Sequence, residues 1–515
     1  MVSWSVSKLV ALALAPSAVL GNIILQQAQR EQYEAQLRDL LSGGPATDSF
    51  IGNEPLWIDQ SLDHFDSSNN QTFRQKYYVN DQFYKPGGPV WFFVGGESAL
   101  DPYWTTSNRT LQYTMAQQTN GLIVALEHRY YGDSNPFSDY SSEHLRFLAS
   151  EQAVEDAAIF AKNYTASNNL PSCTKWIPVG GSYPGNLAAW FREIHPEVFW
   201  AAHSSSGPLT AKADFWEYSY AVREGIPKIA GGSQTCTDNI IRATSLFDQA
   251  IKKDPTGTRQ YLGFGNVDLD GDVGGYLPSN TLAGSIQYGP VGQNFNTSVS
   301  NVDFLCSGKY FPSFADPKAT DDQIWADLQA YSFANLENMG VTPNNNTQLV
   351  AVQTKSLQDP ASSSRLWYWQ TCKEFGYFQN AEHVDAPIYS KTIDLTYQQI
   401  GCGIVFGDAN SVPDTTKTND LYKATDIKTD RIVFVNGAID PWHWLGIFNR
   451  TSTPAQPTFF HDQFHCGDLF VPLRSDTPLL RQVKLGVQAT WLEILKADTC
   501  PSEVNKPYKC VPIKN

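Results

Sequence analysis

Short apolar runs, each ending in glycine or a polar loop, recur along the chain from about residue 56. They lack the alternation of apolar and polar residues that marks a strand with one solvated face. Both faces of these strands are therefore expected to be buried, as in a parallel sheet covered by helices on each side. The runs are residues 89–97, 121–129, 174–182, 431–440 and 458–465.

Segments with apolar residues at helical spacing lie between or after these runs. They are residues 150–164, 186–196 and 478–496. Strands that alternate with helices predict an α/β fold with a mostly parallel central sheet.

The middle of the chain has a different pattern of apolar and polar residues. Residues 210–395 carry polar helical pieces, Gly/Asn loops and cysteines, and the apolar strand pattern does not return until about residue 430. We expect an insertion here, which divides the α/β domain into a first part, 56–209, and a second part, 396–496. Residues 268–275 resemble a calcium loop but lack its final glutamate, so a polar turn is expected.

The two ends of the chain lie outside this pattern. Residues 1–21 combine one early lysine, a short apolar segment and small residues before Gly21, which is typical of a signal peptide. A buried N-terminal helix is the alternative. Residues 22–55 are expected to form an arm or propeptide, and residues 497–515 a C-terminal tail. No later stretch reaches 18 uninterrupted apolar residues.

Composition supports an extracellular protein. The 515-residue chain has a formal net charge of −15, which disfavours nucleic acid and anionic membranes as partners. Its eight cysteines form an even set without a CxxC pair, so disulfides are expected, with Cys500 and Cys510 closing a small loop. We expect no metal and no cofactor. Secretion, or an acidic compartment such as a lysosome or vacuole, also fits six glycosylation sequons, at Asn70, Asn108, Asn163, Asn296, Asn345 and Asn449.

The sequence VGGSYPG places Ser182 between an apolar strand and a helix. A nucleophilic serine occupies such a strained strand-to-helix turn in hydrolases, where small neighbours allow close packing. Pro184 departs from the usual glycine two residues after the serine, although proline is tolerated in a first helical turn. The alternative is an ordinary glycine turn ahead of a helix.

The hydrolase chain order of serine, then acid, then histidine selects the partners. Asp440 follows one downstream apolar run and His465 follows the next. The oxyanion donors are expected to be the backbone N–H of Tyr183 and one from Gly96 or Glu97, in the loop after an early strand. The weaker competitors for the acid and the base are Asp468, His461, His443, and the upstream His64, His128 and His144.

At these residues the sequence resembles the prolyl (Pro-X) carboxypeptidase and dipeptidyl peptidase II family of serine peptidases, in the manner of its secreted fungal members. The similarity covers roughly residues 56–495. It is carried by the motifs GGSYPGNLAAWFR, NGAIDPW, FHCGDL, QSLDHFD, TFRQKYYVND, EHRYYGDSNPF, LRFLASEQAVEDAA and YWQTCKEFGYFQ.

This resemblance implies an α/β-hydrolase fold with a large helical cap and peptide hydrolysis after proline. The family's catalytic residues fall on Ser182, Asp440 and His465, and its cap disulfide on Cys372 with Cys402. Carboxypeptidase and dipeptidyl-peptidase modes both stay open, as does a homodimer. A prolyl endopeptidase, an esterase or lipase, and a non-catalytic module on the same fold are the alternatives.

The peptide substrate needs an apolar slot for proline and a group that binds one peptide end. Trp367 is a candidate for the slot. Glu374 is a candidate for binding a peptide amino terminus, and Arg129 for binding a carboxylate. For both charged residues the alternative is a structural ion pair.

Overall fold

The computed structural model describes residues 54–229, 231–265, 301–338, 340–345, 347–348, 363–407 and 412–496. They form two compact units. The first, which we call the sheet unit, takes the described parts of Leu40–Ala211, Thr416–Ala438 and Trp442–Asn515. The second, the inserted unit, takes those of Lys212–Thr415 together with Ile439–Pro441. The expected signal peptide, nearly all of the arm, and the C-terminal tail with Cys500 and Cys510 lie outside the described residues.

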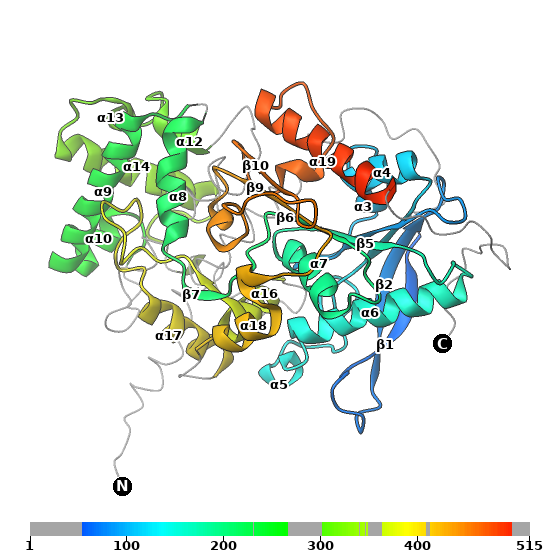
Figure 1. Ribbon diagram of the computed structural model, residues 1–515. Coiled ribbons are helices and arrows are strands. Elements are labelled where there is room, and N and C mark those ends of the chain that lie inside the picture. Colours follow the sequence, from blue (N-terminus) through cyan, green and yellow to red (C-terminus); the bar gives the residue numbers. More distant parts are fainter. Residues whose placement is uncertain are drawn as a thin grey trace, which may run out of the picture. The chain divides into compact units, whose positions relative to one another are not determined.

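The sheet unit is built on eight strands in the order β1-β2-β4-β3-β5-β6-β9-β10, of which Figure 1 labels β1, β2, β5, β6, β9 and β10. β2 is antiparallel to β1 and β4, and all other neighbours are parallel. The prediction of a mostly parallel α/β-hydrolase sheet is confirmed. The strands are β1 (Leu56–Ser61), β2 (Thr72–Asn80), β3 (Val90–Val94), β4 (Leu122–Leu126), β5 (Trp176–Gly181), β6 (Ala202–Ser205), β9 (Ile432–Gly437) and β10 (Thr458–His461).

Helices cover both faces of this sheet, as the apolar runs require. In β3, Trp91 packs against Trp491 and donates its indole N–H to Thr119. The next residue, Phe92, points to the opposite face and packs against Phe160 and Phe191. α4 and α19 therefore lie on one face, and α6 and α7 on the other. All five residues of β3 are buried.

The helices of the sheet unit follow in chain order. They are α3 (Tyr103–Thr106), α4 (Leu111–Thr119), α5 (Ser142–Leu145), α6 (Ser150–Ser167), α7 (Tyr183–Ile194), α18 (Thr415–Tyr422), the short turns η4 (Ala424–Asp426), η5 (Pro441–Leu445) and η6 (Gly467–Leu469), and α19 (Pro478–Lys496). Within the described residues, no helix is both long enough and apolar enough to cross a membrane.

The inserted unit is mainly helical. Its elements are β7 (Lys212–Asp214), α8 (Glu217–Gly225), η1 (Ile226–Lys228), α9 (Gln234–Lys253), α10 (Pro255–Tyr261), α12 (Asn301–Cys306), α13 (Pro312–Ala315), α14 (Asp321–Asn338), α16 (Ser363–Gln370), η3 (Thr371–Phe375), β8 (Gly376–Phe378) and α17 (Leu395–Phe406). β7 and β8 pair in parallel.

Two disulfides tie the inserted unit together. Cys372 is bonded to Cys402, which confirms the pairing that the family resemblance implied. A second bond joins Cys236 on α9 to Cys306 at the end of α12. Each bond fixes a helix to a segment that is distant in sequence.

Candidate active site

Ser182 occupies a strained turn between β5 and α7. Its backbone has φ 65° and ψ −135°, a conformation that L-residues rarely adopt. The Ser182 N–H donates to the carbonyl of Ser205 (3.0 Å), and its own carbonyl accepts from the N–H groups of Gly185 and Asn186. The side chain makes no capping bond to the helix and is partly exposed. The backbone is therefore held on both sides while the hydroxyl projects from the turn.

Two glycines bring neighbouring loops against this turn. A Cβ on Gly96, in the loop after β3, would lie 2.3 Å from Cγ of Pro184. A Cβ on Gly181 would lie 2.7 Å from Sγ of Cys466, the residue after His465. A side chain at Gly96 would collide with the rigid ring of Pro184, and one at Gly181 would have to displace the ends of the Leu469 and Cys466 side chains. The packing places the expected oxyanion loop and the histidine loop beside the Ser182 turn.

Sheet topology accounts for this convergence. The parallel neighbours β3, β5, β6, β9 and β10 have their carboxyl ends at one edge of the sheet. Asp440 follows β9 by three residues, and His465 follows β10 by four. Both side chains are buried, and the His465 ring lies 6.4 Å from that of Trp442. The acid and base expected from the sequence thus follow the strands of this edge.

The His465 loop is anchored to the end of β6. The hydroxyl of Ser206 accepts the backbone N–H of Cys466 (2.9 Å). Asp468 is buried, accepts a bond from the Ser205 hydroxyl, and contacts Nε2 of His203 at 2.8 Å. Burial opposes the charge of Asp468, but His203, His461 and the Ser205 hydroxyl together outweigh it and lower the pKa of this carboxyl. Asp468 was weighed from the sequence only as a competing acid.

His128 supports the first turn of α7. Its Nδ1 lies 2.8 Å from the carbonyl of Arg129, which is an acceptor only, so Nδ1 carries the proton. Nε2 then accepts from the Tyr183 hydroxyl, at 3.0 Å. Burial lowers the pKa of His128 to about 4. Chain order disfavoured His128 as the catalytic base because it precedes Ser182, although it lies in the motif EHRYYGDSNPF.

Arg129 is fully buried and engaged by protein groups. Its Nε and Nη2 donate to the two oxygens of Asp156, both at 2.7 Å. Its remaining donors reach backbone carbonyls of residues 61, 62 and 147. Burial opposes the charge of Asp156, but Arg129 and His64 together hold the pKa of that carboxyl below its usual value. The contacts favour the structural ion pair over the binding of a substrate carboxylate.

The other two substrate candidates lie in consecutive elements of the inserted unit. Trp367 on α16 is half-buried and packs against Phe375 and Tyr377, with ring centroids 5.9 and 6.4 Å away. Glu374 is half-buried in η3, a single turn of π-helix. Such turns occur frequently at functional sites.

The predicted glycosylation sites differ in exposure. Asn70, Asn108, Asn163 and Asn449 are exposed, and Asn345 is half-buried. Asn296 lies outside the described residues. The four exposed asparagines are accessible on the sheet unit.

Comparison with known proteins identifies the family. The family model of serine carboxypeptidase S28 matches residues 60–487. The thymus-specific serine protease of Mus musculus is 31% identical, over 85% of this chain and 88% of its own length. The Homo sapiens protein of that name is 28% identical, over 95% of this chain and 96% of its own length. A probable extracellular serine carboxypeptidase of Arthroderma benhamiae is 31% identical over 75% of this chain and 58% of its own.

Proposed function

Because the chain belongs to the serine carboxypeptidase S28 family of serine peptidases, we propose that it hydrolyses peptide bonds with Ser182 as nucleophile, His465 as general base and Asp440 as the acid that orients the imidazole. The strained turn at Ser182 is the observation that carries this proposal. A positive φ at serine costs free energy. In hydrolases this strained conformation presents the nucleophilic hydroxyl above the sheet, which explains why it is retained.

The reaction is a two-step acyl transfer. The Ser182 hydroxyl attacks the carbonyl carbon while His465 takes its proton, and His465 then gives this proton to the departing amine. Water, deprotonated by the same imidazole, hydrolyses the acyl-enzyme. The backbone N–H of Tyr183 stands in the first turn of α7, where helical N–H groups lack intrahelical acceptors. With an N–H of Gly96 or Glu97, it is assigned to the oxyanion.

Proline before the scissile bond is the proposed preference, and removal of residues from one peptide end the proposed mode. Trp367 and its aromatic neighbours suit the apolar pyrrolidine ring of proline. Glu374 suits a peptide ammonium, which favours dipeptide release. Arg129 is left out of this scheme because the protein itself occupies its donors.

The proposed location is extracellular or an acidic compartment, and the proposed partners are proline-containing peptides. A relative bears an extracellular name, and the disulfides suit an oxidising environment. A homodimer is compatible with this assignment and adds nothing to the chemistry.

The test compares Ser182→Ala with the wild-type protein and with Ser68→Ala, an exposed serine of the same unit. A fluorophosphonate probe is expected to label the wild type and Ser68→Ala but not Ser182→Ala. Hydrolysis of X-Pro peptides is expected to fall by roughly 10³-fold or more in Ser182→Ala alone. A folded Ser182→Ala protein with wild-type turnover would contradict the assignment.

A panel of peptides blocked at the amino end, the carboxyl end or both separates the modes of action. Loss of cleavage on amino blocking indicates dipeptidyl release, and loss on carboxyl blocking indicates a carboxypeptidase. Cleavage of doubly blocked peptides would identify a prolyl endopeptidase. Activity on acyl esters without activity on any peptide would identify an esterase.

A further inference from the structure

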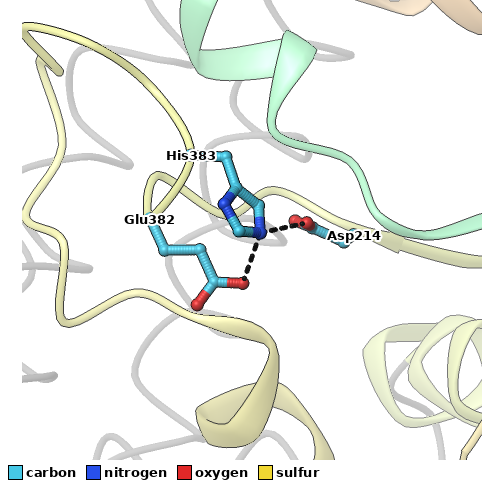
Figure 2. Close-up of side chains that lie close together, drawn as sticks. All are labelled: Asp214, Glu382 and His383. Carbon is cyan, nitrogen blue, oxygen red and sulfur yellow. Dashed lines mark ion pairs between the residues drawn. The ribbon is translucent and has the colours of Figure 1, made fainter.

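Three potential metal ligands meet at one point of the inserted unit, outside the proposed catalytic residues. Figure 2 shows the imidazole of His383 directed between the carboxylates of Asp214 and Glu382. A single ring nitrogen, Nε2, lies 3.2 Å from Oδ2 of Asp214 and 3.3 Å from Oε1 of Glu382. One ligand atom from each residue lies within 4.8 Å of the other two. The three ligand atoms are therefore close enough together to bind a single ion.

The spacing suits tetrahedral coordination. Zinc binds imidazole nitrogen and carboxylate oxygen at about 2.0–2.2 Å, so the edge between two ligands of a tetrahedron is about 3.3–3.5 Å. The two measured separations, 3.2 and 3.3 Å, are close to that length. A mixed nitrogen and oxygen set favours zinc over calcium or magnesium, which prefer oxygen alone.

Both carboxylates are oriented by a second set of contacts. Oδ1 of Asp214 accepts the side-chain N–H of Asn380 at 3.0 Å, which leaves Oδ2 facing His383. Glu382 accepts the backbone N–H of Leu395. Outer contacts of this kind fix ligands in protein metal sites. Crowded carboxylates gain from a cation between them.

Asn380 supplies an independent observation. Its side chain is fully buried and its amide nitrogen contacts Asp214. The oxygen of the same carboxamide has no hydrogen-bond partner among the described residues. A buried oxygen without a partner is costly unless an ion or an ordered water satisfies it. The same side chain therefore holds one of the three ligands, Asp214, and carries a buried oxygen that an ordered water or an ion would satisfy.

We propose that Asp214, Glu382 and His383 form a zinc site with one coordination position left to water. The ion links the end of β7 to the loop after β8, and so ties two segments that are 168 and 169 residues apart in the sequence. Its role is structural, because it holds the end of β7 beside the loop after β8, and β8 directly follows the π-turn of η3. Its ligands come from positions without any motif spacing, so no metal was expected from the sequence.

The test measures zinc binding by the full secreted protein after removal of metal with a chelator. We expect calorimetric titration with zinc chloride at pH 7 to give one site per chain, confirmed by elemental analysis after gel filtration. His383→Ala and Asp214→Asn are each expected to weaken binding at least tenfold. The His383 side chain is largely exposed, so its removal leaves the fold intact.

His195 provides a matched control. It also faces two glutamates, but Glu155 contacts Nε2 while Glu197 contacts Nδ1, on opposite sides of the ring. One ion cannot use that arrangement, so His195→Ala is expected to bind zinc as the wild type does. Absence of zinc binding by the wild type, or equal binding by His383→Ala, would overturn the proposal. Binding of calcium or magnesium without zinc would overturn the choice of metal.

Discussion

Arg129 illustrates how one residue acquires a role from its surroundings. From the sequence it was a candidate for binding a peptide carboxylate. In the structure its planar guanidinium matches the two oxygens of Asp156, and carbonyls take its other donors. A buried ion pair of this kind is strongly destabilised when one partner is removed, because the other charge stays buried and uncompensated.

Arg129→Met is therefore expected to destabilise the sheet unit by about 3–5 kcal/mol. The double variant Arg129→Met with Asp156→Leu is expected to recover part of this loss. Denaturant unfolding measures both. In the folded fraction, KM for peptides with a free carboxylate should not change relative to carboxyl-blocked peptides. A selective rise in that KM would show that Arg129 binds substrate.

At the scale of elements, the strand-to-helix joint of β5 and α7 organises the candidate site. The helix was predicted over 186–196 but begins at Tyr183, because Pro184 fits in a first turn, where its missing N–H has no partner to lose. The last strand was predicted over 458–465 but ends at His461. There the backbone N–H of Gln463 donates a hydrogen bond to Nδ1 of His461, which turns the chain out of the strand. The following loop carries His465.

His128 links this joint to the loop after β4, and its titration gives a pH prediction. Its pKa in the folded protein is about 4, below the ordinary 6.5. Between these values the unfolded chain binds more protons, so the free energy of unfolding falls as the pH drops from 6.5 to 4. This group is expected to contribute up to about 3 kcal/mol of that loss.

The measurement compares wild type and His128→Gln by urea unfolding at pH 7 and pH 4.5. Glutamine retains an acceptor for the Tyr183 hydroxyl but does not titrate. Wild type should therefore lose more stability between these pH values than the variant. An equal loss in both proteins would mean that His128 is not held neutral by burial.

At the scale of the whole molecule, a sheet unit and an inserted helical unit share one chain. The inserted unit carries two disulfides, which close sequence separations of 70 and 30 residues. Cross-links over such loops stabilise a folded protein by about 4 kcal/mol each in the chain-entropy account. The two disulfides suit an oxidising compartment. The formal net charge of −15 disfavours anionic partners such as nucleic acid.

Expression of the whole chain in a eukaryotic host is expected to release the enzyme into the medium. Removal of the signal peptide should leave Asn22 or a later residue as the amino terminus, found by terminal sequencing. Glycosidase treatment should reduce the apparent mass, because Asn70, Asn108, Asn163 and Asn449 are exposed. Retention of the intact chain inside the cell without glycan would contradict secretion.

The sequence by itself determined the features that depend on neighbouring residues. The apolar strands β3, β4, β5 and β9 were identified because both of their faces are buried, and β10 by its aromatic residues, although this edge strand is partly exposed. Ser182 was identified because glycines and proline enclose a strand-to-helix turn. Asp440 and His465 were selected by their place after strands. β1 and β2 were missed because polar and charged residues interrupt their apolar positions (LWIDQS and TFRQKYYVN), and the four-residue β6 because it is too short for a pattern.

Only the tertiary structure decided which distant residues meet. Gly181 lies against Cys466, Arg129 pairs with Asp156, and His383 lies between Asp214 and Glu382. None of these contacts has a fixed sequence spacing, because strand order and loop packing bring the partners together. Burial then fixed their chemistry: it turned Arg129 into a structural ion pair and holds His128 neutral, which the residue types alone do not specify.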